Sequence, residues 1–122
     1  MSEPITMQIN DVEYVRKDSL ATPATNSIGM KYVVIRSRDS GVHAGYLDER
    51  DGSEVTLINS RRLWYWEGAA TLSQLAMEGV SKSSGCKFAV ALPCITVLGI
   101  CEIIPATEAA RNSIEGVPEW KE

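Results

Sequence analysis

The sequence has few of the residues that build metal or disulfide sites. It contains one histidine and three cysteines among 122 residues, and the three cysteines, Cys86, Cys94 and Cys101, are too widely spaced for a paired-thiol motif. We expect the cysteines to be small buried residues. His43 has no carboxylate or cysteine at motif spacing, so we expect a histidine on the surface or at an interface. Neither a disulfide framework nor a zinc site is indicated.

The motifs of common catalytic sites are also absent from the sequence. No glycine-rich loop ends in Gly-Lys-Ser or Gly-Lys-Thr, and no Gly-x-Ser-x-Gly nucleophile motif is found. We therefore expect a binding protein without a cofactor rather than an enzyme.

Long hydrophobic runs and a basic charge excess are missing as well. The longest apolar region, residues 88–104, is broken by Pro93, Thr96, Gly99 and Glu102, so it falls short of the roughly 20 residues that cross a membrane. The first residues lack the basic and then apolar order of a signal peptide, and we expect a cytoplasmic protein. A net charge of -4 argues against a partner such as polymeric nucleic acid, whose binding needs many cationic contacts.

Hydrophobic periodicity predicts an α+β fold with an antiparallel sheet of about six strands and two short helices. The expected domains are an N-terminal hairpin or arm and flexible linker over residues 1–29, a single ligand-binding domain over 30–118, and a tail over 119–122. The expected strands cover residues 30–38, 42–49, 53–58, an arginine-tryptophan strand within 59–68, 86–92 and 95–103. The expected helices cover residues 71–78 and the segment between Thr107 and Gly116. The strand 95–103 is nearly all apolar, so we expect it to be buried on both faces or packed in an interface.

Residues 59–68 combine arginines and aromatic rings, and no acid falls between Val55 and Trp66. As a strand they place Arg62, Trp64 and Trp66 on one face, and Arg61 with Tyr65 on the other. Guanidinium groups match phosphate oxygens, and rings stack on bases, so this composition suits a nucleotide. A strand with one core face and one solvated face is the alternative. We favour a division of roles in which Trp64 and Trp66 are chiefly structural and pack the sheet or a subunit interface, whereas Arg61 and Arg62 supply phosphate contacts.

The chain resembles a known family over roughly residues 30–118. The resemblance lies in residues 31–36, 41–45, 61–68, 72–76, 86–88 and 107–114, of which the Arg-Arg-Leu-Trp-Tyr element beginning at Arg61 is the most distinctive. In these segments the chain is similar to the phage-encoded Thoeris anti-defence sponges of the first described type and to related small phage proteins.

The resemblance implies a non-catalytic sponge that sequesters cyclic ADP-ribose isomers in the host cytoplasm, with cyclic oligonucleotides as a further ligand class. It also implies a homodimer that assembles into hexamers, with the ligand at a dimer interface. The ligand residues that it implies are Arg61, Arg62, Phe88 and Arg111, and a polar contact on the last strand falls on Thr96. The strand pattern adds Tyr65 as a ring beside Arg61.

Two further functions remain open at this point. The aromatic face of Trp64 and Trp66 suits a phage accessory module that binds a host protein, and the same arginines suit an enzyme that degrades a nucleotide. A sponge returns its ligand unaltered, whereas an enzyme does not.

Overall fold

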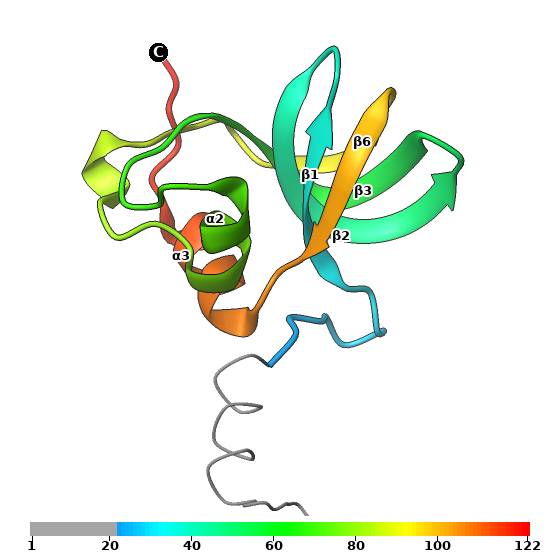
Figure 1. Cartoon of the computed structure of the whole chain (residues 1–122), viewed down its shortest axis with the longest axis horizontal. Helices are drawn as coiled ribbons and strands as arrows, with labels where there is room; N and C mark the ends of the chain where they lie inside the picture. Colours follow the sequence, from blue (N-terminus) through cyan, green and yellow to red (C-terminus); the bar gives the residue numbers. More distant parts are fainter. Residues whose placement is uncertain (1–21) are drawn as a thin grey trace, which may run out of the picture.

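The computed structural model describes residues 22–122, which form one antiparallel sheet with two helices against one of its faces (Figure 1). The strands, in chain order, are β1 (Tyr32–Ser37), β2 (Gly41–Asp51), β3 (Glu54–Tyr65), β4 (Lys87–Phe88), β5 (Leu92–Val97) and β6 (Ile100–Pro105). The helices are α2 (Leu72–Glu78) and α3 (Glu108–Gly116), and a short 3-10 turn, η1 (Ser83–Gly85), precedes β4. The predicted α+β fold class is confirmed.

The sheet has the order β4-β3-β2-β1-β6, and β5 also pairs with β3. The first half of β3 pairs with β5 and the second half with β4, so the long strand carries two different neighbours. Strand β5 pairs with β3, whereas β6 pairs with β1 at the opposite end of the sheet. The short connection between β5 and β6 at Gly99 therefore brings these two parts of the sheet together. The amide of Ile100 donates to the carbonyl of Ser53, and the amide of Arg38 donates to the carbonyl of Gly99. The sheet therefore curls around one of its faces.

The six expected strands do not correspond one to one with the six observed. The expected strands 53–58 and 59–68 are both part of β3, which continues through an irregularity near Asn59, a residue with a φ of 51°. A break of this kind keeps the strand paired while changing which residues face each side. The expected strand 86–92 is only the two-residue β4.

The expected strand 95–103 is wrong as a single buried strand. It is divided at Gly99, whose φ of 69° favours glycine, and the two parts belong to β5 and β6. Leu98 is 60% exposed, and Cys101 is also exposed, so this apolar segment is not buried on both faces within the chain. Apolar composition indicated full burial here, but only Val97 is fully buried, and Ile95, Ile100 and Ile103 are half-buried against the inner cluster.

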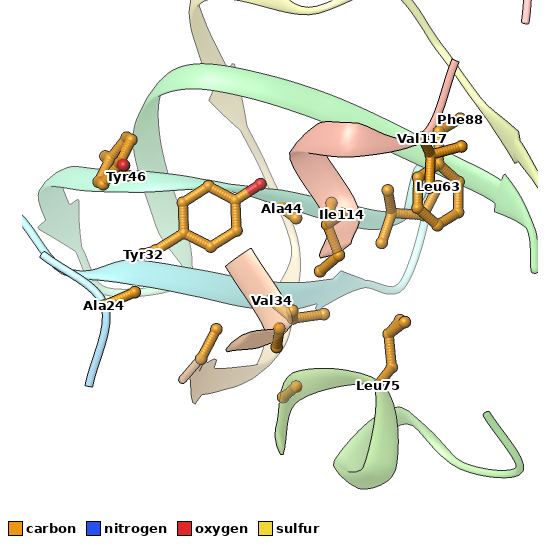
Figure 2. Packing of buried hydrophobic residues seen from close by; sticks show 13 residues of the cluster. Ala24, Tyr32, Val34, Ala44, Tyr46, Leu63, Leu75, Phe88, Ile114 and Val117 are labelled. Atoms are coloured by element: carbon orange, nitrogen blue, oxygen red, sulfur yellow. The ribbon is translucent and has the colours of Figure 1, made fainter. Parts of the chain in front are cut away.

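Two hydrophobic clusters lie on opposite faces of the sheet. Strand β1 contributes to both, because Val34 packs on the helix side whereas Val33 and Ile35 pack inside the curl. On the helix side, Figure 2 shows the ring of Tyr32 between Tyr46 and Ile114, and the two tyrosine rings meet edge to face at 5.0 Å. The inner cluster contains Val33, Ile35, Val55, Leu57 and Val97. A strand buried on both faces explains the continuous apolar run of β1.

Both helices begin where the sequence predicts. The side chain of Thr71 accepts a hydrogen bond from the amide of Gln74 at the start of α2, and Thr107 accepts one from Ala110 at the start of α3. The hydroxyl of Thr107 also donates to the carbonyl of Met77, which ties the two helices together. Thr107 therefore fixes both the start of α3 and its position against α2.

The expected linker is wrong over residues 22–29. Ala24 is buried in the helix-side cluster, its amide donates to the carbonyl of Ala106, and its carbonyl accepts from the amide of Tyr32. These residues are part of the folded domain. The expected N-terminal hairpin lies outside the described residues. At the other end, the amide of Trp120 donates to the carbonyl of Phe88, so the expected tail 119–122 begins with a contact to β4.

Candidate functional site

Arg62 lies at the junction of two hollows on the inner face of the curled sheet. It is the register partner of His43 on β2, and both side chains line both hollows. The polar hollow has a volume of about 370 Å³ and is lined by Asp39, Ser40, His43, Arg62, Ile95, Thr96, Val97 and Leu98. The aromatic hollow, also about 370 Å³, is lined by His43, Ser60, Arg62, Trp64, Ala89, Val90, Leu92, Ile95 and Trp120. Each hollow is of the size that small-molecule sites have.

The guanidinium of Arg62 is held in place but not fully occupied. Its Nε donates to the carbonyl of Ser40 at 2.9 Å, and Nη2 donates to the same oxygen. The guanidinium group lies over the ring of Trp64, with 4.6 Å between the guanidinium carbon and the ring centroid. Nη1 has no hydrogen-bond partner in the part of the chain that the structure describes. Arg62 can therefore donate to an added anion without giving up these contacts.

Apolar side chains are exposed around the aromatic hollow. Trp64 and Trp120 are 57% and 50% exposed, and their rings meet edge to face at 6.5 Å. Val90 and Leu92 are also exposed, and the ammonium of Lys87 lies 5.4 Å from the centroid of the Trp120 ring. A neighbouring aromatic pair with exposed faces provides a stacking surface for a planar group such as a nucleobase.

His43 is a buried histidine at the base of both hollows. It is 2% exposed, and its Nε2 lies 3.2 Å from the hydroxyl oxygen of Ser40. Burial lowers the pKa of His43 below its ordinary value of 6.5, Arg62 lowers it further, and a hydrogen bond with the Ser40 backbone opposes the shift. The ring is therefore neutral at neutral pH. The expectation of a surface or interface histidine is wrong within this chain, because the curl of the sheet covers it.

One buried hydroxyl in the aromatic hollow lacks a partner. The side-chain oxygen of Ser60 makes no hydrogen bond within the described residues, although Ser60 is only 1% exposed. An unpaired buried hydroxyl is unfavourable, so this position favours a bound polar group or water in the hollow.

Arg61, next to Arg62 in the sequence, has a different environment. It is 4% exposed, and its guanidinium donates to the carbonyls of Phe88, Ala89, Ile114 and Val117. It also lies 5.6 Å from the ring centroid of Phe88. Burial lowers the pKa of Arg61, and the carboxylates of Glu119 and Glu115 oppose this shift. Arg61 connects β3, the segment after β4 and the end of α3, so the structure uses its donors within the chain.

The other predicted site residues do not gather around one place. Phe88 is fully buried in the helix-side cluster, whereas Thr96 is exposed and lines the polar hollow with Arg62. Tyr65 is exposed, and its hydroxyl donates to Glu67. Arg111 is on α3, where it donates to the carbonyl of Thr25 and to Asn112. Of the six predicted residues, only Arg62 and Thr96 line a hollow together, whereas Arg61 and Phe88 contact each other in the helix-side interior.

Three contributors to the hollows were not predicted from the sequence, and the burial of the cysteines was predicted wrongly. His43 and Trp120 are distant from Arg62 in the sequence and lie beside it only in the folded chain. For His43, the pairing register of β2 with β3 could have shown this, because it places His43 opposite Arg62. Ser60 is not part of a recognisable sequence motif, so the sequence alone does not indicate its position in the hollow. The sheet packs Trp66 against the helix-side cluster but leaves Trp64 57% exposed, so a structural role for Trp64 would need a subunit interface. The cysteines were expected to be buried, but Cys94 and Cys101 are exposed and Cys86 is intermediate.

Neither a cluster of metal-binding side chains nor a helix that could cross a membrane is found in the described part of the chain. Over residues 22–122, histidine, cysteine and acidic side chains do not cluster in groups that could hold a metal ion. Within the same residues no helix has the length and apolar character needed to cross a membrane.

Comparison with known proteins gives one match. A family model described as Domain of unknown function (DUF6948) covers residues 30–114, which include every strand and all but the end of α3. No curated protein and no solved structure is matched by the chain.

Proposed function

The chain belongs to the DUF6948 family, and we propose that it is a phage anti-defence sponge. In this proposal it binds and sequesters cyclic ADP-ribose isomers, with cyclic oligonucleotides as a second ligand class, in the cytoplasm of the host cell. The ligand class comes from the resemblance to the Thoeris anti-defence sponges. The observation that carries the proposal is the position of Arg62 between a polar and an aromatic hollow.

The chemistry of the two hollows suits the two parts of such a ligand. A cyclic ADP-ribose has a pyrophosphate, two riboses and an adenine in one compact ring. The free Nη1 of Arg62 suits a phosphate oxygen, and Trp64 with Trp120 suits the adenine. Asp39 and Thr96 in the polar hollow suit hydroxyl groups of ribose. Because Asp39 repels phosphate, we expect the phosphate oxygens to lie beside Arg62 and the ribose hydroxyl groups beside Asp39.

Self-association is part of the proposal. A homodimer, and a hexamer built from dimers, would cover the exposed apolar side chains around the hollows. Leu98, Val90 and Leu92 are 60%, 41% and 45% exposed, and the two tryptophans add to the same region. Surfaces of this kind mark interaction sites more often than they mark free solvent-facing positions. Arg111 lies away from Arg62 in its own chain, so it reaches a shared site only from a second copy.

A protein-binding function is the second candidate, and the exposed pair of Trp64 and Trp120 favours it. Tryptophan and arginine are enriched among the residues that dominate protein interfaces. Under this alternative, a host protein copurifies with the wild-type chain and is lost from the Trp64→Ala variant, while no small molecule is released on heating.

The experiment that tests the sponge is a ligand screen on the purified protein. The proposal expects that at least one cyclic ADP-ribose isomer raises the melting temperature, and that mass spectrometry recovers the same isomer unaltered after heating. Binding stabilises the folded state by mass action, by about 2.7 kcal/mol at a hundredfold excess over Kd.

Three outcomes are informative in this screen. Stabilisation with intact recovery supports a sponge, and stabilisation with a changed mass indicates an enzyme. An unchanged melting temperature with every cyclic ADP-ribose isomer and every cyclic oligonucleotide would overturn the proposal.

A further inference from the structure

We infer that His43 is a further ligand-binding residue, which takes up a proton when an anion binds beside Arg62. Ligand affinity then increases as the pH falls. This inference rests on the proposed function, because it concerns the same hollows, but it adds a residue and a proton that the sponge proposal does not require.

The geometry places His43 within reach of the same anion. His43 and Arg62 are register partners on adjacent antiparallel strands, and both line both hollows. Directly opposed side chains on one face of such a pair lie close together. Both also contact Ser40, since Arg62 donates to its carbonyl and the His43 ring lies 3.2 Å from its hydroxyl. A phosphate on Nη1 of Arg62 is therefore a near neighbour of the imidazole.

The charges that face His43 are few. Arg62 comes from β3, and Asp39 from the turn between β1 and β2; these are the charged side chains that line the two hollows. Strand β1 presents Ile35 as the register partner of His43, and β5 presents Ile95 and Thr96. Lys87, which lines neither hollow, has its ammonium 5.4 Å from the centroid of the Trp120 ring. Asp39 is thus the one competing titratable group in the lining.

An added anion reverses the balance of charge at His43. In the free protein, burial and the positive charge of Arg62 both oppose protonation of the imidazole, as its lowered pKa reflects. A phosphate next to Arg62 cancels that repulsion and offers an acceptor for an N–H of the charged ring. The ligand therefore binds more tightly to the protein with charged His43, and by linkage it promotes proton uptake.

Linkage sets the size and the pH range of the effect. Uptake of one full proton increases the affinity by tenfold per pH unit, and partial uptake by less. The increase begins as the pH falls through the pKa of His43 in the complex, and it ends below the lowered pKa of the free protein. Within that interval we expect up to about tenfold tighter binding per pH unit.

The test is calorimetric titration of the full chain with cyclic ADP-ribose and cyclic dinucleotides at about pH 8, 7 and 6. The pyrophosphate of cyclic ADP-ribose and the phosphodiesters of the cyclic dinucleotides stay fully charged over this range, so the phosphate charge is constant. Titrations at one pH in two buffers with different ionisation enthalpies count the protons taken up. In parallel, nuclear magnetic resonance follows the imidazole with and without ligand, and the signal is unambiguous because the sequence has one histidine.

The expected result is proton uptake, an affinity that rises with acidity, and a His43 pKa that is higher in the complex. The His43→Gln variant, which keeps a polar side chain but cannot take up a proton, is expected to lose the pH dependence, and Asp39→Asn to keep it. Should His43→Gln not fold, the resonance titration of the wild type still decides. Binding without proton uptake overturns this inference alone. The absence of binding at every pH, by every cyclic ADP-ribose isomer and every cyclic oligonucleotide, overturns it together with the proposed function.

Discussion

Adjacent arginines on β3 have opposite environments because a strand alternates its side chains between two faces. Arg61 points to the helix side, where four backbone carbonyls accept its hydrogen bonds, and Arg62 points to the hollows. Arg61 and Arg62 are consecutive in the sequence, but in the folded chain their side chains lie on opposite faces of the sheet. Their substitution should therefore have different consequences.

We predict that Arg61→Ala lowers stability and that Arg62→Ala leaves it nearly unchanged. Removal of the Arg61 guanidinium leaves buried carbonyls without donors, at a cost of about 3–5 kcal/mol. Arg62 is partly exposed and has one carbonyl partner, so we expect a loss of about 1 kcal/mol or less. Urea unfolding of both variants measures the difference. Equal losses would contradict the assignment of Arg61 to structure.

The lowered pKa of His43 predicts how the free energy of unfolding depends on pH. Its pKa in the folded chain is lower than the ordinary value of 6.5, so the unfolded chain binds more protons when the pH falls below that value. The free energy of unfolding of the ligand-free protein should therefore decrease from neutral pH until the lowered pKa is reached. Unfolding curves at several pH values measure this slope. The His43→Gln variant should have a smaller slope, and an unchanged slope would assign the effect to other groups.

At the scale of elements, local signals in the sequence predicted more than non-local ones. The helices were predictable because capping threonines mark their starts, and the hairpin between β2 and β3 was predictable from Asp51-Gly52. The exposure of β5 and β6 was not predictable, because their apolar residues look the same in a core and at a sheet edge. The candidate site was predictable only at Arg62 and Thr96, since His43 and Trp120 reach it through long-range pairing.

Thr107 offers a test of how α3 is held. Its hydroxyl oxygen accepts from the amide of Ala110 and donates to the carbonyl of Met77. We predict that Thr107→Val, which keeps the shape, costs about 1–2 kcal/mol through loss of the cap and of a buried partner. The matched control is Thr71→Val at the exposed cap of α2, which has only the cap bond and should cost less. Thermal unfolding compares the two, and a larger loss for the α2 variant would contradict this ranking.

For the whole molecule, the exposed apolar side chains around the hollows predict self-association. Light scattering at micromolar concentration should give a mass well above the 13.4 kDa of one chain. Leu98→Ser, at a 60% exposed position in the β5–β6 connection, should shift the mass downwards, because it removes apolar area from the proposed interface. The control is Ile28→Ser, at a 74% exposed position outside the lining of both hollows. A monomer at all concentrations would contradict the oligomer.

The measurement that tests the central claim most directly is calorimetric titration of cyclic ADP-ribose isomers into the wild type and into Arg62→Ala. Arg36→Ala, on the exposed ion pair with Glu102, serves as the control. We predict that the wild type and Arg36→Ala bind the same isomer with equal affinity, and that Arg62→Ala binds about tenfold to a hundredfold more weakly, as expected for one lost charge-assisted phosphate contact. Equal affinity of the wild type and Arg62→Ala would contradict the account, because the ligand would then bind away from the two hollows.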